Sequence, residues 1–164
     1  MANKKLNKKE GFTIIEVVLV LAIAGLIFLM VFVALPALQR SQRDTQRRDD
    51  MARLATAITT YQTNNNNKLP SNWGDFIGKY LTVNGDTFTD PSGPNYSITS
   101  GEAANSHNAD NPASKDLTNF EAGKVYVWTN AKCNDEDVIY SQGSRDYAIY
   151  FKMEGGGAYC NDNS

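Results

Sequence analysis

The longest hydrophobic run in the sequence lies near its start. Positions 17–38 contain no Asp, Glu, Lys or Arg. At about 1.5 Å per helical residue, this run is long enough to cross a hydrocarbon core of ~30 Å. The pattern therefore predicts a membrane-spanning helix.

Beyond this run the apolar positions recur with a helical period. One predicted stripe contains Met51, Leu54, Ala55, Ile58, Tyr61 and Gln62, whereas Arg47, Arg48, Asp50 and Arg53 fall largely elsewhere. Four consecutive asparagines, 64–67, should end the helix, because Asn tolerates left-handed geometry. One helix from about Phe12 to Thr63 is expected, and its stripe should be the ridge on which a sheet packs.

The remaining residues, 64–164, predict a small head with α+β structure. A short helix capped by Ser71 or Asn72 should end near Leu81 and bury aromatic residues against the long helix. Residues 82–123 are rich in Gly, Ser, Asn, Asp and Pro and predict a long, largely irregular connection, with only brief strand-like pieces such as 87–89 and 96–99. Strands are expected at 124–129, 138–141 and 146–153, in an antiparallel sheet with one face on the helix and a hairpin turn at 142–145.

One residue at the start of the apolar run is out of place. The Glu16 carboxylate costs on the order of 2–3 kcal/mol in such a helix unless it reaches the interface or finds a partner. Cleavage between Gly11 and Phe12 would create an α-amine four residues before Glu16. The Glu16 carboxylate thus needs a cation as partner, and cleavage of the peptide bond between Gly11 and Phe12 would supply one.

The segment Lys-Lys-Glu-Gly-Phe-Thr-Ile-Ile-Glu-Val-Val-Leu-Val-Leu-Ala-Ile-Ala-Gly, residues 8–25, resembles the signal and N-terminal helix of type IV pilins and type II secretion pseudopilins. The resemblance implies that a prepilin peptidase cuts after Gly11. It also implies that Phe12 is N-methylated and that its amine pairs with Glu16 of a neighbouring subunit in a fibre. Such a pair would set the register between subunits rather than add much net stability.

Two simpler interpretations of this segment remain. A single-pass signal anchor would keep residues 1–11 and leave Glu16 at the membrane interface. An ordinary secretory signal has a shorter apolar region and ends at a small-residue cleavage site, so it fits less well. The Gly-Phe-Thr-x-x-Glu arrangement favours the pilin-like interpretation over both.

Charge is distributed unevenly along the chain, although the net charge is only −2. The leader, residues 1–11, carries four lysines and one glutamate and should stay cytoplasmic. The stem, residues 39–63, has a net charge of +2, and the head has −6. Basic residues on both sides of the apolar run leave the orientation open, and the acidic head and the cysteines favour placing the head outside.

Gly25 and Pro36 are the two positions where helical hydrogen bonding should be weakest within the apolar run. By the resemblance, this region loosens when pilin helices pack into a fibre. Pro36 falls a few residues later than the family's usual proline, so a plain kink remains an equal alternative.

The chain has two cysteines, Cys133 and Cys160. In an exported chain we expect them to be bridged, which agrees with the C-terminal disulfide of many type IV pilins. Asp135, Glu136 and Asp137 lie beside Cys133, and calcium binds at a similar place in one kind of pseudopilin. These residues lack an EF-hand spacing, so a solvated acidic loop is the better interpretation and no metal or cofactor is predicted.

Enzymatic activity and nucleic-acid binding find little support. His107 is the only histidine and has no partner at triad or metal-ligand spacing, so we expect it on the solvated surface. An acidic head offers no basic patch for phosphate contacts. Direct nucleic-acid binding is therefore not expected, even though pilus-like fibres can take up DNA.

These observations together predict a structural subunit of an extracellular type IV pilus. Its predicted parts are a leader (1–11), an apolar helix (12–38), a stem (39–63) and a head (64–164). Its expected partners are copies of itself in a helical filament, prepilin peptidase, the assembly machinery and the cytoplasmic membrane before assembly. Roles in adhesion and twitching motility follow from the resemblance. A minor pilin, a pseudopilin and a non-assembling membrane anchor are the alternatives.

Overall fold

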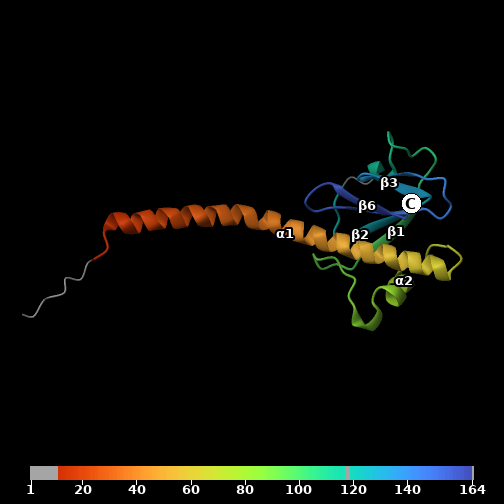
Figure 1. Cartoon of the computed structure of the whole chain (residues 1–164), viewed down its shortest axis with the longest axis horizontal. Helices are drawn as coiled ribbons and strands as arrows, with labels where there is room; N and C mark the ends of the chain where they lie inside the picture. Colours follow the sequence, from red (N-terminus) through yellow and green to blue (C-terminus); the bar gives the residue numbers. More distant parts are fainter. Residues whose placement is uncertain (1–10, 117–118, 164) are drawn as a thin grey trace, which may run out of the picture. The chain divides into compact units, whose positions relative to one another are not determined.

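A computed structural model describes residues 11–116 and 119–163 of the chain (Figure 1). The predicted leader, apart from Gly11, lies outside these described residues. The chain divides into two compact units, Met1–Leu38 and Gln39–Ser164.

The described part of the first unit is the N-terminal portion of helix α1, Ile14–Asn64. Its large apolar side chains are exposed along the helix. By length and composition α1 can cross a membrane, with a mean hydropathy of 3.2 in its most apolar window. The helix runs through both Gly25 and Pro36. The predicted long helix is confirmed.

In the second unit the C-terminal half of α1 packs into a hydrophobic core. Met51, Leu54 and Ile58 are fully buried there, together with Val127 and Ile149 from the sheet. The expected apolar stripe is therefore present. The placement of Arg47 and Asp50 away from it was wrong, because both side chains are buried on the same side of the helix.

Helix α2, Trp73–Tyr80, also packs on α1, as the spacing of its aromatic residues predicted. The Asn72 side chain caps it by accepting hydrogen bonds from the amides of Gly74 and Asp75. Tyr61 of α1 makes edge contacts with the rings of Phe76 and Tyr80, each with 5.6 Å between ring centroids. The Asn72 cap thus defines where α2 begins, and the aromatic contacts with Tyr61 hold α2 against α1.

The main sheet has four strands in the order β1-β2-β5-β6. Its strands are β1, Ser97–Glu102, β2, Lys124–Thr129, β5, Tyr147–Lys152, and β6, Ala158–Asp162. β5 is antiparallel to both neighbours, whereas β1 runs parallel to β2. The expectation of a wholly antiparallel sheet was therefore wrong at β1. This strand overlaps the strand-like piece expected at 96–99 and extends it to Glu102, inside a segment that was expected to be largely irregular. The same segment holds the short 3-10 turns η1, Val83–Gly85, and η2, Ala113–Asp116.

A separate hairpin covers the face of the sheet that is turned away from α1. It pairs β3, Ala131–Asn134, with β4, Asp137–Tyr140. Val138 packs with Ala148 and Tyr150 of β5 in a second hydrophobic cluster. Residues 142–145 are therefore not the turn of a β4–β5 hairpin, because β4 pairs with β3. The first five residues of β5 are buried because the strand is covered on both faces.

Candidate functional site

The first turn of α1 is organised by Thr13. Its carbonyl accepts hydrogen bonds from the amides of Glu16, at 3.1 Å, and Val17, at 3.3 Å. Its hydroxyl also accepts from the Glu16 amide, at 3.4 Å. Thr13 thus acts as a cap and satisfies a helix amide that has no partner within the helix.

Phe12 and Glu16 lie on one side of this first turn. Together with Val17, Val20 and Leu21 they line a shallow hollow of about 330 Å³. The Phe12 side chain is 86% exposed. In the part of the chain that the structure describes, no cation pairs with the Glu16 carboxylate. The hollow thus combines an apolar surface with one carboxylate at its edge.

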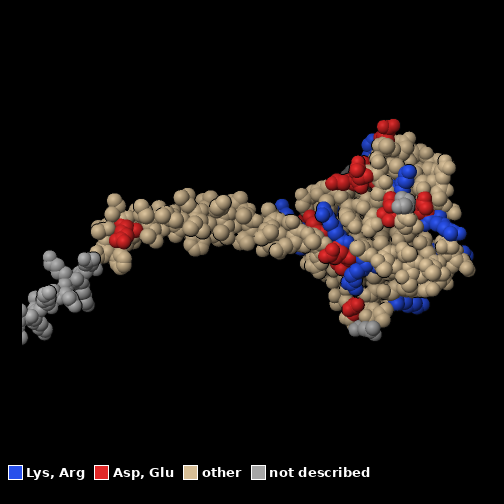
Figure 2. Space-filling model, in the orientation of Figure 1, with Lys and Arg blue, Asp and Glu red and all other residues tan. Residues whose placement is uncertain are grey.

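Positions 17–38 of the first unit form an apolar helix surface without charge. Glu16 is the one charged residue in positions 11–38, and Figure 2 shows this helix tan apart from one acidic group. Gly25 is surrounded by open space, and a methyl group added there would meet no atom within 4 Å. Pro36 lies inside the helix. The sequence-predicted residues Phe12, which directly precedes α1, and Glu16 thus line the same hollow, while Gly25 and Pro36 lie farther along α1.

A buried ion cluster in the second unit was missed by the sequence analysis. The Arg47 side chain is only 1% exposed. Its Nε and Nη2 atoms donate to Asp90, at 2.6 and 2.8 Å, and Nη1 donates to Asp44 at 2.8 Å. Nη1 also reaches Glu154 at 3.3 Å, and the ring of Phe120 lies 4.9 Å from Cζ. Arg47 therefore ties three parts of the head to the stem.

The pKa directions in this cluster follow from its geometry. Burial alone would lower the pKa of Arg47, but hydrogen bonds to Asp90 and Asp44 outweigh it and raise the pKa. Burial would raise the pKa of Asp90, and hydrogen bonds from Arg47 and Ser92 lower it. Arg43 donates to Glu154, which lowers the pKa of Glu154 to about 2. Arg47, Asp90 and Glu154 are therefore ionised in the folded protein at neutral pH.

A signal for this cluster was present in the sequence. Asp44 and Arg47 continue the buried stripe of Met51, Leu54 and Ile58 at alternating spacings of three and four residues. Because Arg47 is charged, it was expected to lie away from this stripe. Their counter-charges, Asp90 and Glu154, are 43 and 107 residues away from Arg47, and no local pattern identifies them.

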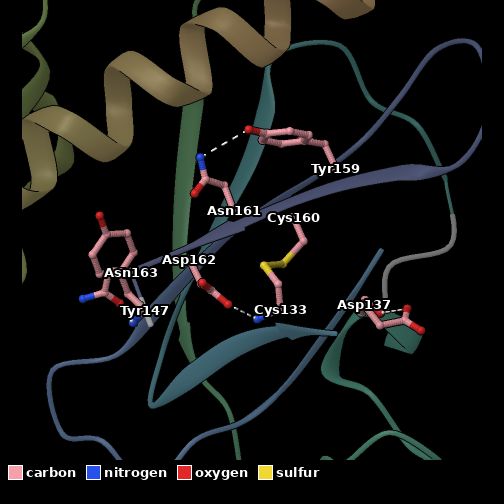
Figure 3. The surroundings of a disulfide bond; sticks show 9 residues. Cys133, Asp137, Tyr147, Tyr159, Cys160, Asn161, Asp162 and Asn163 are labelled. Carbon is pink, nitrogen blue, oxygen red and sulfur yellow. Dashed lines mark hydrogen bonds between the residues drawn. A yellow bond between two sulfur atoms is a disulfide. The ribbon is translucent and has the colours of Figure 1, made fainter. Parts of the chain in front are cut away.

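The C-terminal part of the head is joined by the predicted disulfide between Cys133 and Cys160 (Figure 3). It connects β3 of the hairpin to β6 of the main sheet. The Asp162 carboxylate accepts a hydrogen bond from the Cys133 amide at 2.5 Å. The bridge and this bond hold the hairpin against the sheet.

The nearby acidic residues serve the local fold. Glu136 accepts from the Ala158 amide at 3.2 Å, and Asp137 accepts from the Ser114 hydroxyl at 2.5 Å. Among residues 11–116 and 119–163, no group of three or more His, Cys, Asp or Glu residues could hold a metal ion. His107 is half-buried, not fully solvated, and its Nδ1 accepts from the Ala104 amide at 3.1 Å.

Comparison with protein families places the N-terminal residues in a known group. Residues 6–32 match the family model described as the prokaryotic N-terminal methylation motif. The chain carries this motif. This motif is the N-terminal signal of type IV pilins and pseudopilins, and the match supports a pilin-like or pseudopilin protein. The comparisons with curated proteins and with solved structures found no match.

The motif covers the turn with Phe12 and Glu16 and extends through Gly25. It implies processing by prepilin peptidase and a pilus-assembly context. Together with the apolar helix, it fits anchoring in a membrane. The pilin-like signal and the apolar helix surface therefore lie on the same residues.

Proposed function

We propose that the chain is the structural subunit of an extracellular type IV pilus filament. The observation that carries this proposal is the single carboxylate, Glu16, at the start of an exposed, charge-free helix directly after the Gly11–Phe12 junction. A plain membrane anchor has no need of a carboxylate at this position, whereas an assembling helix can use one.

The first step in this function is cleavage after Gly11 by prepilin peptidase, followed by N-methylation of Phe12. The new amine would lie one helical turn from Glu16, on the side where both residues line the hollow. A cation and a carboxylate that are each costly in an apolar bundle offset one another when they pair. Pairing between the amine of one subunit and Glu16 of the next sets the axial register.

The second step is burial of the apolar helix. Large apolar residues such as Leu21, Leu26 and Leu29 are 65%, 71% and 68% exposed. These side chains contact lipid in the cytoplasmic membrane first and then pack against the helices of neighbouring subunits. A contact that repeats one orientation without closing produces a helical filament. Gly25 and Pro36 are the places where the helix can adjust to this packing.

The head supplies the outer surface of the filament. It has a net charge of −6 and a disulfide between Cys133 and Cys160, which suits an oxidising extracellular environment. No catalytic role is proposed for it. In this proposal the leader is residues 1–11, the apolar helix 12–38, the stem 39–63 and the head 64–164.

The test is intact mass measurement and N-terminal sequencing of protein from sheared cell-surface material. The proposal expects an abundant chain that begins at methylated Phe12. A mature chain present in only trace amounts would identify a minor pilin. A mature chain that stays in the cell envelope would identify a pseudopilin, and a chain that begins at Met1 in membranes would identify a signal anchor.

The role of the carboxylate is tested by Glu16→Gln, which keeps the shape and removes the charge. We expect the variant to be made and inserted in the membrane but to be strongly depleted in the sheared fraction. Val17→Ile is the matched control, because it changes the neighbouring residue without changing charge. Normal fibre yield from Glu16→Gln would refute the pairing mechanism.

A further inference from the structure

The two edges of the main sheet differ in how they are covered. At the β6 edge, Cys160 is joined to Cys133 of β3, and the Ala158 amide donates to Glu136. The hairpin therefore lies beside this edge without strand pairing, and one outward amide of β6 is already hydrogen-bonded. The other edge strand is β1, and its outward backbone groups differ in their hydrogen bonding from those of β6.

The hydrogen bonds of β1 alternate along the strand. The Ser97 amide donates to the Gly123 carbonyl at 2.7 Å, and the Ala103 amide donates to the Thr129 carbonyl at 3.0 Å. In a parallel pair, alternate residues of a strand face their partner strand. The backbone groups of Ser97, Thr99 and Gly101 therefore face β2, and those of Ile98, Ser100 and Glu102 face away from it.

These three outward-facing residues leave a row of unpaired backbone groups. Within residues 11–116 and 119–163, no group hydrogen-bonds to the outward amides or carbonyls of Ile98, Ser100 and Glu102. Ser100 and Glu102 are exposed, and Ile98 is half-buried. The row is thus accessible to a strand from another molecule.

β1 also lacks the features that usually protect an edge strand. Proteins block such edges with proline, lysine, bulges or a covering segment. The sequence of β1 is Ser-Ile-Thr-Ser-Gly-Glu, with one charge at its end and no proline. Its amide and carbonyl groups therefore form a template for strand addition.

The other described strands of a second copy do not offer such an edge. The outward amide of Cys133 in β3 donates to Asp162, and that of Tyr140 in β4 donates to the His107 carbonyl. β2 and β5 are central strands. In β6 the outward Ala158 amide donates to Glu136. Among the described strands, β1 is therefore the edge strand on which none of the outward amides has a partner.

We propose that β1 is a self-association surface, where two copies pair their β1 strands antiparallel about a two-fold axis at Ser100. In this register Ser100 lies opposite Ser100 of the second copy, and Ile98 lies opposite Glu102 of the second copy. Every outward amide and carbonyl of the three residues then finds a partner. A shift by two residues leaves some of these groups unpaired.

The charges are compatible with this register. Each Glu102 lies opposite an isoleucine rather than opposite the other Glu102. The two carboxylates are four residues apart along the strands, about 13 Å, which exceeds the screening length of ~8 Å at physiological salt. The two sheets become one continuous eight-stranded sheet.

The pairing differs from filament assembly in symmetry and in the residues that it uses. A two-fold contact closes after two copies, whereas a filament repeats one orientation. In the proposed filament, such a pair would join subunits of two different filaments side by side. It does not depend on Phe12 or Glu16, so it stands whether or not the chain forms a filament.

The experiment uses the full chain in detergent micelles and measures amide hydrogen exchange in β1. Ser100→Lys and Ser100→Glu are made separately, because each places like charges directly opposite one another in the pair. Mixing the two variants places Lys opposite Glu. Thr63→Lys and Thr63→Glu, at an exposed stem position, are the charge-matched controls.

In the wild type and in the Thr63 controls, exchange at Ile98, Ser100 and Glu102 should slow several-fold as the protein concentration rises. Each Ser100 variant alone should lack this slowing, and their equimolar mixture should regain it. Association through the apolar helices would leave these amides unaffected. The Thr99 and Gly101 amides, which bond to β2, should stay protected throughout and report a folded sheet.

Three results would overturn the proposal. One is exchange in wild-type β1 that does not depend on concentration. Another is slowing that persists unchanged in each Ser100 variant alone. The third is a mixture of the two variants that exchanges as fast as either variant alone while Thr99 stays protected.

Discussion

Replacing Arg47 by methionine should strongly destabilise the second unit. Methionine keeps the length and apolar stem of the side chain and removes the guanidinium. The change leaves the Asp90 carboxylate, whose side chain is 1% exposed, and the Asp44 carboxylate, at 9%, without their main cation. Removing one partner of a buried ion pair costs about 3–5 kcal/mol, a large share of the ~5–15 kcal/mol that stabilises a typical domain.

The matched control is Arg48→Met, one residue farther along the same helix. Arg48 is exposed and contacts the Met153 sulfur at 3.0 Å. Because no buried carboxylate depends on it, the free energy of unfolding should change by less than about 0.5 kcal/mol. The two variants make the same chemical change and differ in burial and ion pairing.

The assay is urea unfolding of the full chain in mild detergent, followed by tryptophan fluorescence. Both tryptophans, Trp73 and Trp128, lie in the head, so the signal reports the second unit. Asp90→Asn and the double variant with Arg47→Met complete a thermodynamic cycle. Because the two residues share hydrogen bonds, the double variant should lose at least about 1 kcal/mol less than the sum of the single losses.

Free energies of unfolding for Arg47→Met and Arg48→Met that agree within about 1 kcal/mol, the size of a typical point-mutation effect, would contradict this prediction. Simply additive losses from Arg47→Met and Asp90→Asn would contradict it as well. Either result would mean that the buried cation contributes no more than its apolar contacts.

Three further predictions concern the head. The hydrogen bond from Arg43 lowers the pKa of Glu154 from 4.5 to about 2. Ionised Glu154 therefore stabilises the fold at pH values above the ordinary pKa of a glutamate. This contribution should be lost as the pH falls from 4.5 towards 2; Glu154→Gln should remove that part of the pH dependence of the urea midpoint, and an unchanged profile would contradict the assignment. Replacing both Cys133 and Cys160 by serine should lower the free energy of unfolding by about 3.5 kcal/mol, because the disulfide closes a loop with a sequence separation of 27 residues. Reduction of the wild type should give a similar loss. Equal stability of the oxidised and reduced protein would contradict this contribution of the disulfide. Gly78→Ala should raise the free energy of unfolding by roughly 0.5–1 kcal/mol, because Gly78 is helical and a methyl group there meets nothing within 4 Å. A lower thermal midpoint for this variant would contradict the prediction.

The sequence could predict the elements that depend on nearby residues. The charge-free run 17–38 and the first-turn residues Phe12 and Glu16 identify an apolar helix and its pilin-like signal without any tertiary contact. The same holds for α2, whose Asn72 cap and aromatic spacing are local. Helical period, capping and membrane length all act within a few residues, so they can be read along the chain.

Strand pairing could not be predicted in the same way. The alternation in β2 and β5 identified two strands, but β4 was assigned to the wrong partner because adjacency in sequence suggested a hairpin with β5. Parallel pairing of β1 with β2 requires a long crossover, and no local signal in a Gly- and Ser-rich segment specifies it. Which strand lies beside which is decided by how the whole head packs.

The charged residues show the division most clearly. Arg47 has the same local surroundings as Arg48, yet one is buried and the other exposed. The difference arises because Asp90 and Glu154, distant in sequence, converge on one side of the helix. The sequence by itself determined the apolar helix, its pilin-like signal and the two cysteines. The tertiary structure decided the buried ion cluster and the open β1 edge, because burial and pairing depend on residues brought together only by folding.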